Sequence, residues 1–270
     1  MTRSPNTPVI ELVRPRGAGV EIFRVRSTAP YPTHVAQEYR IALVLAGAKR
    51  FDHRRASWIA PRGAVMMAAP GEAHAGRPVG ARLDVLMVCV AAERLAHAPD
   101  FRPSIVADDE LAGRVATLAH VARAEGDGLA VDHSVAALLD LWVARYGSLA
   151  APPRAPRGRE PAGVTRAREL IHARLGEVVT LAELTRVSGL PRARLVRAFH
   201  QELGLPPHAY QLHARVDWAR ALLVGGLAPA VVAVATGFCD QSHLNRHFTR
   251  IVGLPPGRYR SATVESNSSS

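Results

Sequence analysis

The last third of the chain contains an internal repeat, and this repeat restricts the possible folds more than any other feature. The segments LVRAFHQELGLPPHAY, at residues 195–210, and LNRHFTRIVGLPPGRY, at residues 244–259, align without a gap at an offset of 49. Upstream, at an offset of 48, Thr185, Val187 and Gly189 pair with Ala233, Ala235 and Gly237. The chain therefore contains two copies of one structural unit.

Each copy predicts a helix-turn-helix. Thr180 and Glu183 form an S/T-x-x-E capping box, which fixes the start of a helix in the first copy. Gly189 and Gly237 supply the tight turns, and each second helix stops at Gly-Leu-Pro-Pro. Between the copies, residues 208–226 predict a connecting helix of about 16 residues, about 24 Å long. Such a connector could set the two second helices about 34 Å apart, one turn of DNA.

The second helix of each copy is expected to read DNA. Leu244, Phe248 and Ile251 recur at helical spacing and face the core, as do Leu195 and Phe199 in the first copy. The side chains that then face outward are Gln241, Ser242, Asn245 and Arg246 in the second copy, and Arg192, Ala193, Arg194, Val196 and Arg197 in the first. Arginine pairs with guanine, and glutamine or asparagine pairs with adenine. Alanine and valine can contact thymine methyl groups, and Arg192 and Arg194 can contact phosphates.

A zinc site is an alternative interpretation of part of the second helix in the second copy. Cys239, His243 and His247 recur every four residues. Cys239, however, falls in the turn before the helix, and the segment is not His-Glu-x-x-His and lacks a convincing fourth ligand. We therefore favour DNA reading and expect the two histidines on a flank, in phosphate contacts or in packing.

The distribution of charge supports a polyanionic partner. Residues 1–152 carry 18 Lys+Arg against 15 Asp+Glu, whereas residues 153–260 carry 16 Arg against 7 Asp+Glu. A solvated basic surface without a partner is the alternative. Two distant cysteines and the absence of an apolar signal segment indicate the reducing cytoplasm. The uncharged run at residues 221–239 is broken by Gly225, Gly226 and Pro229, so we predict no membrane span.

The N-terminal part predicts strands followed by two helices, which makes the whole chain an α+β protein of more than one domain. Residues from about 8 to 95 contain apolar runs of strand length; Ile41, Leu43 and Leu45, for example, alternate on one face. This pattern predicts a small β-barrel or sandwich. Two amphipathic helices follow, with apolar stripes at Leu111, Val115, Leu118, Val121 and at Val135, Leu138, Leu139, Trp142, Tyr146. They are expected to pack on the barrel or to form a dimer contact.

The C-terminal part resembles the AraC/XylS family of bacterial transcription regulators. The resemblance covers about residues 164–260 and rests on TLAELTRVSGL, RVDWARALL and VAVATGFCDQSHLNRHF, with VGLPPGRYR at the end. It implies two recognition helices in adjacent major grooves of promoter DNA, with base contacts at Ala193, Val196, Arg197, Gln241, Ser242, Asn245 and Arg246. It also implies RNA polymerase as a partner and no cofactor. Family members usually open the first recognition helix with Ser-Pro, whereas this chain has Pro191-Arg192, which removes the usual serine cap.

The N-terminal part resembles, less specifically, the cupin-type sensing domain common in that family. THVAQEYRIALVLAG and GAVMMAAPGEAH resemble its two motifs. Metal-binding cupins have His-x-His and Glu in the first motif, but this chain has Ala36 after His34, so one metal ligand is missing. His34, Glu38 and His74 are therefore expected to line a small-molecule pocket rather than to bind a metal.

The resulting prediction is a DNA-binding regulator, not an enzyme, that activates transcription in response to a small molecule. Its expected parts are a cupin-like sensing domain at residues 1–106, a helical pair at 107–150, a linker at 151–163, an all-α DNA-binding domain at 164–262 and a disordered tail at 263–270. The helical pair could form a homodimer. The alternatives are a ligand-free regulator whose barrel serves dimerisation, and a metal-dependent cupin enzyme.

Overall fold

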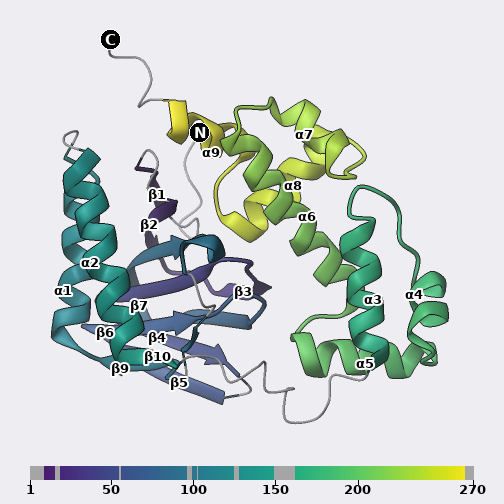
Figure 1. The fold of residues 1–270 in the computed structure, drawn as a ribbon, viewed down its shortest axis with the longest axis horizontal. Coiled ribbons are helices and arrows are strands. Elements are labelled where there is room, and N and C mark those ends of the chain that lie inside the picture. The colour runs from purple at the N-terminus through teal and green to yellow at the C-terminus, as the bar shows by residue number, and fades with distance from the viewer. Residues whose placement is uncertain are drawn as a thin grey trace. The chain divides into compact units, whose positions relative to one another are not determined.

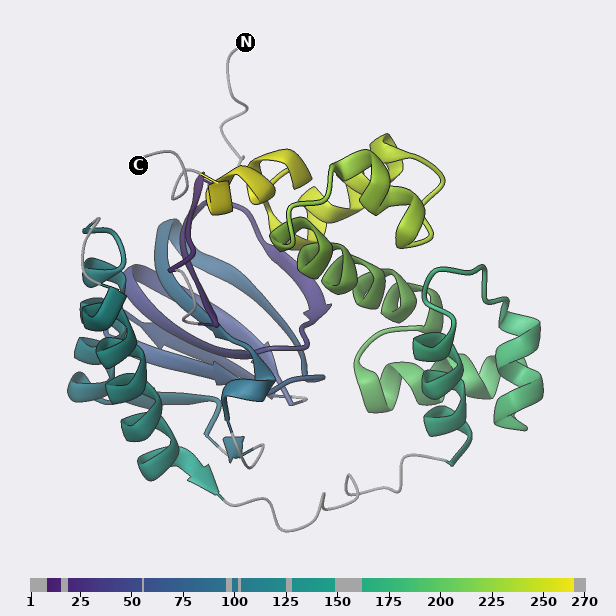
Figure 2. The same cartoon turned by 45° about the horizontal axis from the view of Figure 1, so that its top comes forward.

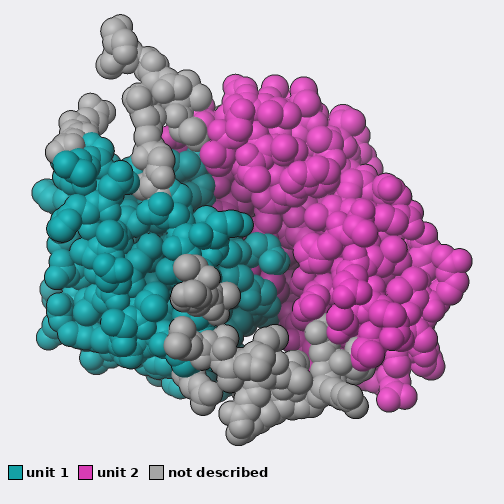
Figure 3. Space-filling view, in the orientation of Figure 1, with its two compact units in different colours: residues 1–32, 37–151 teal, residues 33–36, 152–270 magenta. Residues whose placement is uncertain are grey.

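The computed structural model describes residues 9–15, 19–54, 56–95, 99–101, 103–124, 128–148 and 162–264. The chain divides into two compact units, residues 1–32 with 37–151 and residues 33–36 with 152–270 (Figure 3). Most of the expected linker and of the expected tail lies outside the described residues. Within those residues, no helix has the length and apolar character needed to span a bilayer.

The N-terminal unit is built on one eight-stranded sheet. Its strand order is β1-β2-β7-β4-β6-β9, with β3 beside β7 and β5 beside β4. The strands are β1 (Val9–Val13), β2 (Val20–Ser27), β3 (Tyr31–Val35), β4 (Tyr39–His53), β5 (Ala56–Pro61), β6 (Ala64–Ala68), β7 (Ala73–Val90) and β9 (Ile105–Ala107). A second, two-stranded sheet pairs β8 (Asp100–Phe101) with β10 (Gly147–Ser148), and a short 3-10 helix, η1 (Ala92–Arg94), follows β7.

The long strands β4 and β7 form the centre of this sheet and are irregular in their middle. Their antiparallel register shifts between Val44 and Ala46 and again between Ala46 and Ala48. Gly47 lies at this irregularity with φ 76°, and a Cβ there would collide with the carbonyl oxygen of Arg82. The expected barrel is present as an irregular, largely antiparallel sheet: among the described strands no ladder joins the edges β1 and β9.

Two helices cover one face of the sheet, as Figures 1 and 2 show. Helix α1 (Asp109–Val121) and helix α2 (Gly128–Tyr146) bury the two apolar stripes that the sequence predicts, except for Val121 and Tyr146, which are partly buried. These stripes share a core with one face of the sheet, which includes Ile41, Leu43 and Val88. The indole of Trp142 in α2 stacks on Phe101 with ring centroids 4.1 Å apart. Helix packing on the sheet is therefore observed, whereas the dimer contact stays a prediction.

From residue 162 to residue 264, the regular elements of the C-terminal unit are all α-helices; residues 33–35 of this unit belong to β3. Its helices are α3 (Ala162–Ala173), α4 (Leu181–Ser188), α5 (Arg192–Leu203), α6 (Pro207–Val224), α7 (Pro229–Ala235), α8 (Gln241–Val252) and α9 (Pro256–Val264). Helix α6 corresponds to the expected connector and has 18 residues, about 27 Å at 1.5 Å per residue. Figure 1 shows α3, α4 and α5 gathered at one end of α6 and α7, α8 and α9 at the other. The unit is thus two helix-turn-helix units joined by one helix.

Candidate nucleic-acid interface and effector site

Helix α5 exposes the face that the sequence assigns to DNA. Its buried side includes Leu195 and Phe199, both fully buried. The expected DNA-contacting residues lie on the remaining surface: Arg192, Ala193, Arg194 and Arg197 are exposed and Val196 is half-buried. The helix begins at Arg192 after Pro191, and no side chain caps it. The local sequence therefore places three arginines on the outside of α5, two of them in its first turn.

Helix α8 has the same buried face and a different exposed face. Leu244 and Phe248 are fully buried, as their counterparts Leu195 and Phe199 are. The four expected base-reading residues are all exposed: Gln241, Ser242, Asn245 and Arg246. Gln241 and Ser242 open the helix, directly after Asp240. This face can donate and accept hydrogen bonds, as the reading of base edges in a major groove requires.

An arginine from the preceding helix holds each helix-turn-helix turn. In the first unit, Arg166 of α3 donates to the carbonyl oxygens of Val187 and Ser188, at 2.8 Å each. In the second unit, Arg215 of α6 donates to the carbonyl oxygens of Leu175, Gly237 and Glu177, at 2.8, 2.8 and 2.6 Å. Sequence reasoning missed both arginines. Their offset is 49, as for residues 195–210 and 244–259, and one residue more than the offset of 48 at the turns, so the repeat extends upstream to α3 and α6.

The tyrosine at the end of each repeat packs against the buried phenylalanine of its recognition helix. Tyr210 meets Phe199 edge to face at 5.9 Å, and Tyr259 meets Phe248 in the same way at 5.1 Å. The Tyr210 hydroxyl lies 2.9 Å from Nε2 of His172, whereas the Tyr259 hydroxyl accepts a 3.0 Å hydrogen bond from Arg220. Each pair thus fixes the recognition helix against the helix that follows it.

The two histidines of α8 pack against each other and against Phe238. The rings of His243 and His247 are 4.7 Å apart, and those of Phe238 and His243 are 5.3 Å apart. Burial and nearby Arg250 lower the pKa of His247 to about 4. Cys239 precedes the helix and is exposed. Among the described residues, no group of three or more His, Cys, Asp or Glu side chains is placed to hold a metal ion.

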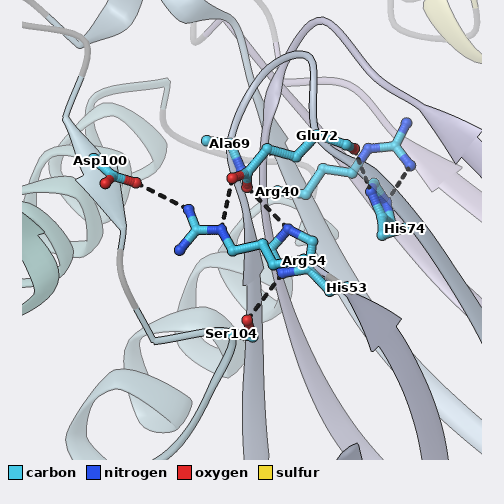
Figure 4. A network of polar contacts seen from close by, with 8 residues as sticks. All are labelled: Arg40, His53, Arg54, Ala69, Glu72, His74, Asp100 and Ser104. Carbon is cyan, nitrogen blue, oxygen red and sulfur yellow. Dashed lines mark hydrogen bonds and ion pairs between the residues drawn. The ribbon is translucent and has the colours of Figure 1, made fainter. Parts of the chain in front are cut away.

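A polar network in the N-terminal unit joins the end of β4 to the β6–β7 turn, to β8 and to the residue before β9 (Figure 4). His53 lies 3.0 Å from the Ser104 hydroxyl and 2.9 Å from Glu72. Arg54 donates to Glu72 at 2.7 Å and to Asp100 at 2.9 Å. Burial disfavours ionisation of Glu72, but these hydrogen bonds and one from the Ala69 backbone outweigh it and lower its pKa to about 2.

Serine, histidine and carboxylate follow one another in this network, yet the arrangement is structural. His53 and Ser104 are both buried, and the Glu72 carboxylate is already held by Arg54 and by the Ala69 N–H at 2.8 Å. Burial leaves Ser104 little access to a substrate. The network therefore ties loops together around a buried histidine.

The three predicted pocket residues are only partly brought together. Arg40, which the sequence reasoning did not select, contacts two of them. It donates to Glu38 at 3.3 Å. It also lies 3.5 Å from Nε2 of His74 (Figure 4). His34 lies in the neighbouring short strand β3. Burial, and next the charge of Arg40, lower the pKa of His74 to about 3, so its imidazole is neutral at neutral pH.

Comparison with known proteins finds two families, one in each part of the chain. Residues 18–146 match the AraC-like ligand binding domain, and residues 184–262 match a helix-turn-helix domain. The HTH-type transcriptional regulator YbfI of Bacillus subtilis (strain 168) is 25% identical over 237 residues, which cover 83% of this chain and 86% of that protein. The probable transcriptional regulator LumQ of Photobacterium leiognathi is 33% identical over 91 residues, 33% of this chain and 37% of that protein.

The fold as a whole is similar to that of ToxT from Vibrio cholerae. A structure of wild-type ToxT from strain SCE256 with bound unsaturated fatty acid superposes with a TM-score of 0.50 at 11% identity, covering 96% of this chain and 97% of that one. Another ToxT structure, from strain O395, gives a TM-score of 0.51 at 10% identity over 91% of this chain and 98% of that one. At such identities the likeness shows a shared fold.

Proposed function

The chain belongs to the AraC family of helix-turn-helix transcriptional regulators, and on that premise we propose that α5 and α8 read promoter DNA while the N-terminal unit binds a small-molecule effector. The observation that carries the DNA-reading role is the repeated recognition helix. Both copies bury the same leucine and phenylalanine, and both expose an arginine between them, Arg197 in α5 and Arg246 in α8. The buried pair holds each helix in its unit, and the exposed set is available to contact DNA.

The exposed residues suit different parts of the duplex. In α8, Gln241, Asn245 and Arg246 can pair with base edges in the major groove. In α5, Arg192 and Arg194 are placed in the first turn, where they can bind phosphates, and Arg197 can reach a base. Ala193 and Val196 can contact thymine methyl groups. The N-terminus of α5, which no side chain caps, favours anions as well.

The N-terminal unit is proposed to act as the sensor. ToxT, which shares the fold, has been solved with a small molecule bound, and this chain matches the ligand-binding domain of the family over residues 18–146. An effector would shift the equilibrium by binding one arrangement of the protein more tightly than another. We further propose activation of transcription together with RNA polymerase, a cytoplasmic location, a homodimer contact through α1 and α2, and no catalytic activity.

DNA footprinting near the gene for this chain and its neighbours tests the DNA-reading role. Arg246→Ala should cost about 1–3 kcal/mol of binding to the protected site and relax base preference there, because a bidentate arginine–guanine pair is lost. Arg62→Ala is the matched control: it removes one exposed arginine from the β5–β6 turn of the N-terminal unit, outside every proposed contact, and should leave binding unchanged. Equal losses on specific and random DNA would contradict base reading by Arg246.

Two measurements address the alternatives. A thermal-shift screen of metabolites that finds no stabilising compound would favour a ligand-free regulator whose N-terminal unit serves dimerisation. Metal analysis of purified protein that finds stoichiometric iron or manganese would favour a cupin enzyme. A regulator that senses an organic effector should be stabilised by at least one metabolite and should carry no stoichiometric metal.

A further inference from the structure

Arg215 in helix α6 contacts both helix-turn-helix units, the first formed by α3 to α5 and the second by α7 to α9. Its guanidinium donates to the Gly237 carbonyl oxygen at 2.8 Å, in the turn between α7 and α8. It also donates to the carbonyl oxygens of Leu175 and Glu177, at 2.8 and 2.6 Å, in the loop between α3 and α4. One side chain therefore joins the turn of the second unit to a loop of the first.

That loop and that turn also approach each other directly. A Cβ at Gly237 would lie 2.7 Å from the Gly176 carbonyl oxygen, and a Cβ at Gly176 would lie 3.2 Å from the Ala235 carbonyl oxygen. The Trp218 ring of α6 lies beside the same place, 3.6 Å from the Cβ position of Gly176. The two backbones thus pack together beside Arg215 and Trp218, in a contact that we call the Arg215 junction.

Hydrogen bonds within each unit hold the two sides of the Arg215 junction in shape. In the loop, Arg174 donates to Glu177 at 2.6 Å and to Glu183 at 2.7 Å, and Glu183 also completes the capping box of α4. At the end of α7, the buried Thr236 hydroxyl donates to the Val232 carbonyl oxygen at 2.7 Å. The junction therefore connects two ordered segments, each tied to the helices of its own unit.

Arg166, the equivalent residue 49 positions earlier, has a narrower role. Within the described part of the chain it donates to the carbonyl oxygens of Val187 and Ser188, both at the end of α4 in its own unit. A guanidinium is a planar fork of five N–H donors, so one arginine can hold several oxygens in fixed directions. Both arginines therefore hold a turn, and Arg215 holds the other unit as well.

We propose that Arg215 is a positioning residue that fixes α5 and α8 relative to each other, so that the protein accepts one spacing between the two DNA segments it reads. Helix α6 packs against both units and sets their distance, but bending or twisting of one helix would still change their relative orientation. The Arg215 junction is a second connection beside α6, and it opposes such movement. This inference rests on the proposed DNA-reading function and adds a residue that sets its geometry.

The spacing of the operator tests this role. One base pair inserted between the two segments moves one of them by about 3.4 Å and rotates it by about 35° around the duplex axis. A rigid pair of recognition helices cannot follow this change. On the site found by footprinting, the full-length wild-type protein should therefore lose about tenfold in affinity or more, the loss expected when one base contact no longer forms.

Arg215→Met removes the donors and keeps a flexible apolar side chain of similar length. If it folds, as thermal melting checks, it should lose at most about threefold on the same insertion, because its two units can adjust separately. Arg166→Met is the matched control: it removes the equivalent arginine and should keep the tenfold spacing preference of the wild type, whatever it does to overall affinity. An unchanged spacing preference in folded Arg215→Met would overturn the proposal.

A distance measurement on the full-length protein tests the junction without DNA. Ala193→Cys in α5 and Ser242→Cys in α8 place nitroxide labels at equivalent exposed positions of the repeat. Cys239→Ser removes the exposed native cysteine, while Cys89 is buried. Double electron–electron resonance should then give one narrow distance distribution between the two recognition helices.

Arg215→Met should broaden this distribution, whereas Arg166→Met should leave it narrow. Arg215→Lys keeps the charge without the planar fork, so it should also broaden the distribution, and it decides the question if Arg215→Met does not fold. A distribution as narrow as that of the wild type in the folded variant would refute the assignment. If footprinting finds no protected site, the DNA-reading function fails, while the distances still decide whether Arg215 joins the units. Protection with equal affinity at both spacings refutes only this inference.

Discussion

The first helix-turn-helix unit fixes the start of its first helix, whereas the second unit fixes the start of its second. In α4, Thr180 and Glu183 form a complete capping box, while α5 begins after Pro191 without a side-chain cap. In the second unit the pattern is reversed: α7 begins without a side-chain cap, and the Asp240 carboxylate accepts a 2.7 Å hydrogen bond from the His243 backbone at the start of α8. The two copies therefore bury the same face of the recognition helix but cap different helices: the first copy caps α4 and the second caps α8.

This difference matters because the first turn of a recognition helix lies nearest the DNA. In α8 the first turn carries Gln241 and Ser242, whose short side chains need a fixed backbone to meet a base edge. In α5 the first turn carries Arg192 and Arg194, long side chains that can reach phosphates from several backbone positions. We therefore expect α8 to contribute more of the sequence preference and α5 more of the general affinity for DNA.

The turns of the two units also differ, in how closely they are packed. Gly189 and Gly237 both have positive φ, 69° and 75°. A Cβ at Gly189 would meet only the end of the Arg166 side chain, at 3.7 Å. A Cβ at Gly237 would lie 2.7 Å from the Gly176 carbonyl oxygen and 3.0 Å from the Arg215 guanidinium. The second turn is therefore the less tolerant of a side chain.

Substituting alanine for the two turn glycines should change the stability of the two helix-turn-helix units more than any other substitution proposed for them. Gly189→Ala should cost about 1 kcal/mol, the strain of a left-handed residue with a Cβ. Gly237→Ala adds overpacking against backbone and Arg215, and it should cost about 2–4 kcal/mol in total. Native-state hydrogen exchange of the full-length protein measures both, through the amides of α5 and α8.

Gly257→Ala is the control for these substitutions. Gly257 lies in helix α9 with open space where a Cβ would be, so alanine should be neutral or slightly stabilising there. If Gly189→Ala destabilised α5 as much as Gly237→Ala destabilises α8, the proposed difference in turn packing would be wrong.

Removing the cap of α8 or adding one to α5 should change helix stability less than the glycine substitutions do. Asp240→Ala removes the side-chain acceptor of α8 and should destabilise it by about 1 kcal/mol, whereas Asp240→Asn keeps an acceptor and should cost little. Pro191→Ser supplies the acceptor that α5 lacks and should stabilise the start of α5 by at most about 1 kcal/mol. Hydrogen exchange at the first turns of α5 and α8 is the measurement. Equal protection in wild type and Asp240→Ala would mean that the cap does not hold α8.

The sequence predicted the helical unit well because its signals are local. The capping box at Thr180, the turn at Gly189 and the stop at Gly-Leu-Pro-Pro each act within a few residues, and the repeat supplied the turn and the stop twice. The contacts of Arg166 and Arg215 were missed because an arginine that donates to carbonyls 21 to 40 residues away depends on tertiary packing. Only their offset of 49 could have suggested them.

The sensing unit was predicted less completely because the irregularity of β4 changes which side chains share a face. Ile41, Leu43 and Leu45 alternate toward the helices, and continuing this alternation would put Lys49 and Phe51 on the same side. The register shifts between Val44 and Ala48 place Phe51 in the opposite cluster. Such shifts leave no clear mark in a single sequence. His34, Glu38 and His74 were selected from their positions in the two cupin-like motifs, and those motifs give no sign that Arg40 contacts Glu38 and His74.

Lowering the pH should destabilise α8 slightly more than α5. His247 of α8 has its pKa lowered to about 4, first by burial and then by Arg250, whereas its counterpart in α5, 49 residues earlier, is the uncharged Ala198. The unfolded chain takes up a proton at His247 near pH 6.5, and the folded chain does so only near pH 4. The unfolded state therefore binds more protons between these values, and the stability associated with His247 is complete above pH 6.5 and falls as the pH drops toward 4.

Hydrogen exchange at pH 7 and pH 5 should accordingly show α8 losing more protection than α5, after correction for intrinsic exchange rates. His247→Gln should remove this difference, because glutamine does not titrate. His172 also has a pKa lowered by burial, but it contacts Tyr210 in α6 rather than α5, so its protonation should weaken the Tyr210 contact before it affects α5. An NMR titration of the His247 ring with a midpoint near pH 6.5 would contradict its burial. It would also contradict the packing of the His243 and His247 rings beside Phe238 on the flank of α8.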